Sequence, residues 1–140
     1  MSRYRFTSLY GGSHQTSNFT QTNFSTIINQ FLQLRTDIKM YHWQTDSFAY
    51  HKISDELLDS IDSLTDKFVE AVVGAIDLKP EVIGQSTITI NNLNKESFIE
   101  KLRSAHKSLK ELQGVGSEIY NIRDELLGAI DKALYLMKMS

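Results

Sequence analysis

Six of the histidine and acidic side chains in residues 48 to 73, a stretch with the composition of a helix, recur at three- and four-residue steps. At about 100° per residue they fall within an arc of roughly 100° on one helix face. Imidazole and carboxylate groups that share a face can bind a metal ion such as iron, manganese or zinc. The six residues of this stripe are His51, Asp55, Asp59, Asp62, Asp66 and Glu70.

The stripe is symmetric about a point between residues 60 and 61, because position 51 mirrors 70, 55 mirrors 66 and 59 mirrors 62. Within one helix, at ~1.5 Å per residue, Asp55 and Asp66 stand roughly 16 Å apart and cannot share an ion. If a second copy of the helix lay antiparallel across a two-fold axis, His51 and Asp55 of one chain would face Glu70 and Asp66 of the other. The stripe therefore predicts two equivalent pockets in a dimer, and a solvated acidic face is the alternative interpretation.

Composition limits the chemistry further. The 140 residues suffice for one domain, and with no Cys any metal site must use His and carboxylate ligands. The net charge of -2 argues against a surface built mainly for nucleic-acid phosphates. No apolar run approaches the ~18 residues of a membrane span, and the N-terminus lacks the apolar core of a signal peptide. We therefore expect a cytoplasmic protein.

Apolar residues recur at three- and four-residue steps in four stretches, which predicts four helices. We expect residues 1–22 to form a flexible polar tail and residues 23–140 to form the bundle. The expected helices run from Ser25 to the polar residues at 44–47, from about Phe48 to Val73 with Gly74 as the stop, from Asn94 to about Leu112, and from Ser117 to about Met137.

The connections between these helices indicate the topology. Two are short, at residues 44–47 and at 114–116, whereas residues 75–94 form one long crossover that contains the only proline. Short connections make antiparallel neighbours, and one long crossover joins the two pairs. The sequence thus predicts an all-α, ferritin-like four-helix bundle with a long crossover between its second and third helices.

The usual di-metal site inside such a bundle needs Glu-x-x-His motifs, and this chain contains none. His106 lies beside Arg103 and Lys107, so we expect it to be a solvated surface histidine. The remaining candidates are His42 and Trp43 at the end of the first helix. Each has a structural explanation alone, since histidine suits a helix C-terminus and tryptophan packs at helix junctions. Their position one short turn from His51 and Asp55 favours a metal site.

These motifs resemble those of the Dps-type miniferritins, the DNA-binding proteins from starved cells. In that family a His-Trp pair ends the first helix, His-x-x-x-Asp begins the second, and Asp-x-x-x-Glu follows later in the second helix. The matching segments here are 42–43, 51–55 and 66–70, and the spacing from His51 to Glu70 agrees without a gap. The similarity extends over most of residues 25–138, although only these motifs are specific.

The resemblance implies an inter-subunit ferroxidase centre that takes His42, His51 and Asp55 from one chain and Asp66 and Glu70 from its two-fold mate. In such proteins iron(II) is oxidised, commonly by hydrogen peroxide, and ferric mineral is stored in a hollow shell of twelve subunits. Trp43 would lie beside the centre as an electron donor. Asp59 and Asp62 have no counterpart in the family motif, so we expect them to be interface or solvated charges.

Three features depart from the family pattern: the connection between His42 and His51 is shorter and lacks the customary glycine, the last two helices are short, and the tail is poor in lysine. The short connection and the polar tail favour a rival interpretation, in which the bundle is a structural or assembly module without catalysis, whereas the short helices and the lysine-poor tail argue against a twelve-subunit cage and DNA binding. A third role, DNA binding, rests on Arg3, Arg5 and the family analogy, and the acidic balance argues against it.

Overall fold

The computed structural model describes residues 18–140, and every regular element in this range is a helix. The prediction of an all-α four-helix bundle is confirmed. None of these helices combines the length and the apolar character needed to cross a membrane. The four helices are α1 (Gln21–Gln44), α2 (Phe48–Ile76), α3 (Lys95–Lys110) and α4 (Ser117–Met139).

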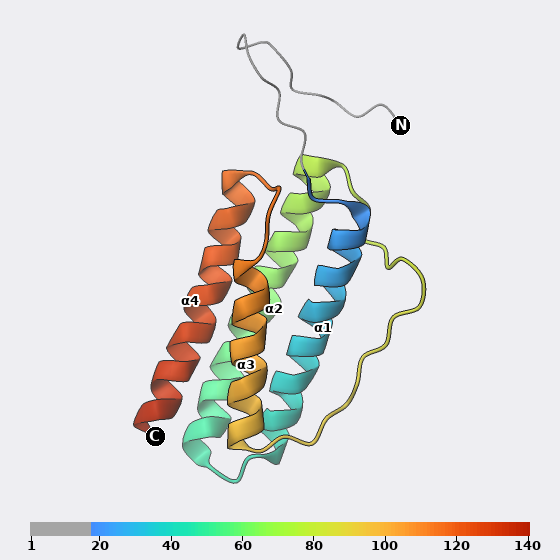
Figure 1. The fold of residues 1–140 in the computed structure, drawn as a ribbon. Helices are drawn as coiled ribbons and strands as arrows, with labels where there is room; N and C mark the ends of the chain where they lie inside the picture. The colour runs from blue at the N-terminus through green and yellow to red at the C-terminus, as the bar shows by residue number, and fades with distance from the viewer. Residues whose placement is uncertain (1–17) are drawn as a thin grey trace.

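The helices stand at the corners of a square. Helix α1 contacts α2 and α3, and α4 contacts the same two helices, so that α1 lies diagonally across from α4. Figure 1 shows that α2 and α3 run in one direction and α1 and α4 in the other, which makes all adjacent pairs antiparallel. Because α2 and α3 run the same way, the chain must travel the length of the bundle between them, and residues 77–94 do so along the outside of α1.

Helix α1 begins at Gln21, earlier than the expected start at Ser25. Thr20 and Asn23 form a capping box, in which each side chain bonds the other residue's backbone N–H, and this satisfies two donors at the helix end. Phe19 is buried just before the cap. Of the predicted tail, residues 1–17, including Arg3 and Arg5, lie outside the described residues.

Helix α2 does not stop at Gly74, where the sequence predicted its end. It continues to Ile76, and Asp77 then takes the left-handed conformation with φ 60°. Aspartate tolerates this conformation better than most residues. The turn places Leu78 in the core, at 8% exposure. Burial of Leu78 therefore moves the helix end past the glycine.

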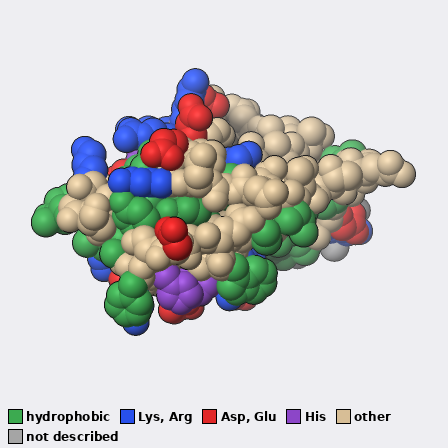
Figure 2. Space-filling model, turned by 90° about the horizontal axis from the view of Figure 1, so that it is seen from below, with side chains coloured by type: hydrophobic (Ala, Val, Ile, Leu, Met, Phe, Trp, Pro, Cys, Tyr) green, Lys and Arg blue, Asp and Glu red, His purple; other side chains and the backbone are tan. Residues whose placement is uncertain are grey.

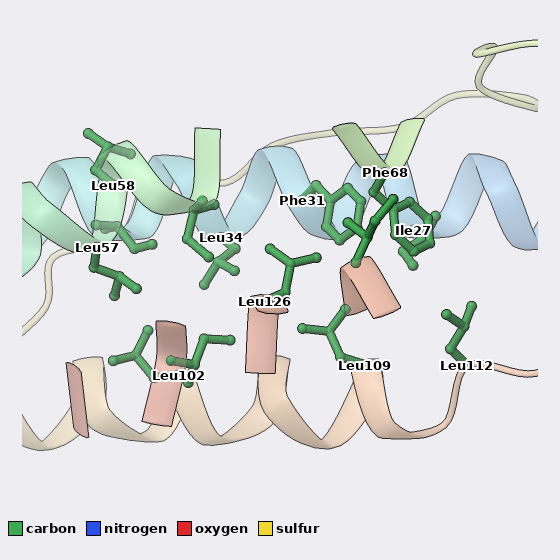
Figure 3. Close-up of a cluster of buried hydrophobic side chains, with 14 of the residues drawn as sticks. Ile27, Phe31, Leu34, Leu57, Leu58, Phe68, Leu102, Leu109, Leu112 and Leu126 are labelled. Carbon is green, nitrogen blue, oxygen red and sulfur yellow. The ribbon is translucent and has the colours of Figure 1, made fainter. Parts of the chain in front are cut away.

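The core is the set of apolar stripes that the helical period predicted. Phe24, Phe68 and Phe98 are fully buried, and the Phe31 and Phe68 rings meet edge to face at 5.2 Å. Figure 3 shows leucines of all four helices, and Leu112 from the connection between α3 and α4, in this buried cluster. Each large apolar side chain that is fully buried contributes about 1.5–3 kcal/mol. Every fully buried side-chain nitrogen or oxygen in the described part of the chain has a hydrogen-bond partner.

A ladder of polar side chains on α1 holds the crossover against the bundle. Its members lie about one or two helical turns apart, so they form one stripe. At the centre, the Thr89 backbone N–H donates to Gln33 Oε1 and Gln33 Nε2 donates to the Thr89 carbonyl, both at 2.8 Å. An extended chain without a strand partner is satisfied in this way. The ladder joins Gln21 to Lys79, Ser25 to Ile83, Asn29 to Ser86 and Thr87, Gln33 to Thr89, Asp37 to Asn91, and Gln44 to Asn92 and Leu93.

We predict that Gln33→Ala loosens the crossover without unfolding the bundle. The change removes two hydrogen bonds to Thr89, each worth about 0.5–1.5 kcal/mol. Amide hydrogen exchange at Thr89 should accelerate by roughly ten-fold or more, while exchange at core amides such as Phe68 stays slow. Gln30→Ala, on an exposed face of the same helix, is the matched control. Unchanged exchange at Thr89 would contradict a ladder that restrains the crossover.

Candidate functional site

Residues 45–47 form a tight turn that positions the site. Helix α1 ends when Thr45 takes an extended conformation, and Ser47 caps α2 by accepting a hydrogen bond from the Tyr50 N–H at 3.3 Å. Because only three residues separate the helices, the last turn of α1 lies against the first turn of α2. The turn thereby brings His42 to His51.

The two histidines bind each other's backbone. His42 Nδ1 lies 3.0 Å from the His51 carbonyl oxygen, and His51 Nδ1 lies 3.0 Å from the His42 carbonyl oxygen. The rings stack at 3.9 Å between centroids and 23° between planes. This reciprocal arrangement locks both rings in place relative to the helix ends.

The same hydrogen bonds determine which ring nitrogen of each histidine is left to bind a ligand. A carbonyl oxygen can only accept a hydrogen bond, so both Nδ1 atoms carry hydrogen. In the neutral imidazoles Nε2 is then the atom with a free lone pair. Metal-binding histidines characteristically donate their other ring N–H to a carbonyl or carboxylate in this manner. The pair therefore has the tautomers that metal coordination through Nε2 requires.

Ser54 contacts the histidine pair from the buried side of α2. It is fully buried, its Oγ lies 3.2 Å from His42 Nδ1, and its hydroxyl is within donating distance of the Tyr50 carbonyl at 2.8 Å and the His51 carbonyl at 3.0 Å. Sequence reasoning did not identify Ser54. The available signal was a serine three residues after His51, on the side of the helix that faces α1.

Asp55 completes the cluster on one chain. Its Oδ1 lies 4.0 Å from His42 Nε2, on the side of the ring that carries the free lone pair. His42 itself is only 8% exposed, whereas His51 and Asp55 are exposed. The structure thus brings His42 against His51 and Asp55 close to His42 despite the short connection. Burial raises the pKa of the Tyr41 hydroxyl, in the residue before His42, above its ordinary value.

Trp43 lies at the surface beside this cluster, with 66% of its area exposed and Lys39 Nζ 5.1 Å from its ring. Phe48, just across the turn, is also exposed. Figure 2 views this end of the bundle and shows histidine at the surface between hydrophobic side chains, with acidic groups nearby. The site is therefore open at the protein surface, with a partly apolar rim.

Asp66 and Glu70 are not brought to the cluster within one chain. Both are exposed on α2, and Asp66 lies three turns beyond Asp55, roughly 16 Å along a continuous helix. Across residues 18–140 of a single chain, no three His, Asp or Glu side chains are grouped so that they could hold a metal ion. One chain presents the predicted ligand set in two separate parts, and every residue of the set except the buried His42 is exposed.

The centre of the stripe has a different role. Asp62 Oδ1 accepts a 2.7 Å hydrogen bond from Arg35 Nε of α1, whereas Asp59 is exposed. Both line a shallow groove between α1 and α2, together with Phe31 and the half-exposed Leu32. The acidic stripe thus lies beside apolar surface, and Arg35 offsets the negative charge of Asp62.

His106 differs from the expected solvated histidine. Its Nε2 lies 2.9 Å from Asp131 Oδ1 of α4, and its side chain is 21% exposed. In the sequence the neighbours of His106 are basic, and its acidic partner, Asp131, lies 25 positions away on another helix. His106 therefore links α3 to α4 and is separate from the α1–α2 cluster.

Comparison with known families places the chain in one of them. It belongs to DUF5856, a family of unknown function, whose model matches residues 42–137. The matched range begins at His42 and includes both halves of the stripe. No curated protein and no solved structure matches the sequence.

We predict that His42 and His51 occupy the Nδ1–H tautomer when neutral, because each Nδ1 donates to a backbone carbonyl. Free histidine favours the other tautomer, so the ¹⁵N chemical shifts of the ring nitrogens report the difference. His106 is the internal control and should carry hydrogen on Nε2, which faces Asp131. Nε2–H signals from both His42 and His51 would contradict the reciprocal arrangement.

Proposed function

We propose that this protein is a Dps-like iron-binding protein that oxidises iron(II) at a centre shared between two subunits. The observation that carries the proposal is the reciprocal pair of His42 and His51, whose Nδ1 atoms are occupied by carbonyls and whose Nε2 atoms are left for a ligand. A packing role for the two rings does not require Asp55 beside Nε2 of His42.

The donor set suits iron. Imidazole and carboxylate ligands bind iron(II), and carboxylates bind the harder iron(III) in preference. Two copies of α2 that cross antiparallel near residues 60 and 61 would bring the partner's Asp66 and Glu70 to His51 and Asp55. Four carboxylates meeting across this axis would repel one another, and bound cations would offset that repulsion. The proposed centre therefore depends on both the dimer and the metal.

Iron is the substrate in this proposal, and the oxidant is hydrogen peroxide or oxygen. With peroxide, two iron(II) ions supply two electrons, the O–O bond breaks, and two protons complete two water molecules. His42, His51 and Asp55 would bind the ions from one chain, and Asp66 and Glu70 from the other. Exposed Trp43 would supply or accept an electron beside the centre. Storage of the ferric product in a larger cage extends the same proposal.

A structural or assembly module is the second candidate. The observation that favours it is the self-sufficient core, in which fully buried polar side-chain atoms of residues 18–140 are all satisfied without a cofactor. The two candidates differ in how assembly responds to metal. Subunit assembly that persists in chelator, with no iron bound on titration, would favour the module.

We expect anaerobic iron(II) titration followed by peroxide to give ferric absorbance faster than in buffer, and Asp66→Ala/Glu70→Ala to reduce the rate to that of buffer. The two carboxylates are exposed, so their loss should leave the fold intact. Glu96→Ala/Glu100→Ala, an exposed pair on α3 at the same four-residue spacing, is the matched control. Wild-type oxidation at the buffer rate, or a double variant as fast as wild type, would sink the ferroxidase proposal.

A mixing experiment tests whether the centre is shared. We expect His51→Ala/Asp55→Ala and Asp66→Ala/Glu70→Ala to be inactive alone and to regain activity when refolded together. A mixed dimer holds one intact centre of two, so random mixing should restore roughly a quarter of wild-type activity. Recovery is the outcome that a centre within one chain cannot produce. No recovery, despite mixed dimers detected by mass spectrometry, would contradict the shared centre.

A further inference from the structure

A second candidate site lies between α1 and α3, away from the histidine pair. A cavity of about 220 Å³ opens there, with Phe31, Leu34 and Leu109 on its apolar wall and Asp37 among its polar lining. This volume is well above the roughly 10–15 Å³ that a cavity needs to hold one water molecule. It falls below the ~300–1,000 Å³ typical of drug-sized ligands, so it fits only a small molecule.

Asp37 is the unusual member of this cavity. It is 2% exposed, yet no Lys, Arg or His among the described residues lies within 4.0 Å of its carboxylate. Its Oδ1 accepts hydrogen bonds from Gln33 Nε2 at 3.1 Å and Asn91 Nδ2 at 3.0 Å. Buried carboxylates are normally paired with a cation. Two neutral amides compensate the charge only in part.

The second oxygen, Asp37 Oδ2, accepts no hydrogen bond from residues 18–140. Because no fully buried side-chain oxygen in that range lacks a partner, Oδ2 keeps a small accessible surface, and Asp37 is one of the residues that line the cavity. The cavity thus combines one unsatisfied anionic acceptor with an apolar wall. These two features recognise a cationic donor attached to an apolar body.

We propose that this cavity binds a small organic primary ammonium ion, with its ammonium group on Asp37 Oδ2 and its apolar part against Phe31, Leu34 and Leu109. An ammonium ion fits better than a divalent metal, because a metal needs several charged or oxygen ligands and Asp37 is the only carboxylate among the described residues that line the cavity. Lys101 also lines the cavity, but it is exposed and lies beyond 4.0 Å from Asp37.

The crossover takes part in this site. Asn91 belongs to the crossover and donates to the Oδ1 atom of Asp37, while Gln33 donates to the same atom and also binds Thr89. The polar ladder therefore positions the carboxylate and closes one side of it. This arrangement explains why a buried acidic residue occurs in a ladder otherwise built from amides and a hydroxyl.

The probe is 2-phenylethylammonium, and 2-phenylethanol is its neutral counterpart of nearly the same shape. Added to ¹⁵N-labelled full-length protein, the amine should produce saturable shifts confined to the amides around Asp37 and the facing part of α3. Asp37→Asn keeps the size and the Oδ1 acceptor and should weaken amine binding by ten-fold or more. Binding of the alcohol should be unchanged, and Asp59→Asn, an exposed carboxylate on α2, should bind the amine like wild type.

Three outcomes would overturn the proposal: no localised shifts with the amine, equal affinity of wild type for amine and alcohol, or equal amine affinity in Asp37→Asn and wild type. Lys101→Met separates the proposal from an internal ion pair. If Lys101 were the resident cation of Asp37, its removal should tighten amine binding strongly, whereas we expect a change below about three-fold. The comparison of amine with alcohol on wild type remains decisive if Asp37→Asn does not fold.

Discussion

The three-residue turn between α1 and α2 is the constraint on which the candidate site depends. It forces two long helices into antiparallel contact and brings the last turn of one against the first turn of the other. Only in that arrangement can His42 and His51 exchange hydrogen bonds with each other's backbone. The bonds hold the rings and determine which ring nitrogen carries hydrogen.

Helix α1 performs three tasks on three faces. Its apolar face packs in the core, its C-terminal turn supplies His42, and its polar stripe binds the crossover through side chains. The side chains of the polar stripe give the extended crossover hydrogen-bond partners that strand pairing would otherwise supply. These hydrogen bonds also explain how a long connection stays against the bundle without secondary structure. Asp37 departs from this pattern, because a charge appears where amides would suffice.

The proposed iron centre and the proposed ammonium site use the same physical argument in different ways. In both, hydrogen bonds within the fold occupy one atom of a side chain and leave another atom for a ligand: Nε2 of the histidines and Oδ2 of Asp37. The histidine pair is open at the surface and lacks part of its ligand set within one chain. The cavity is lined by described residues of one chain. The two sites therefore differ in their dependence on assembly.

The sequence alone determined the four helices, most of their ends and the stripe on α2, because apolar periodicity, capping residues and breakers are local signals. The sequence also predicted that His42, His51 and Asp55 belong to one metal site. Only the tertiary structure decided the histidine tautomers, the role of Ser54, the partner of His106 and the polar ladder. These depend on contacts between residues as many as 60 positions apart, or on hydrogen bonds to backbone atoms whose position follows from packing. Burial of Leu78 likewise overrode the local stop signal of Gly74.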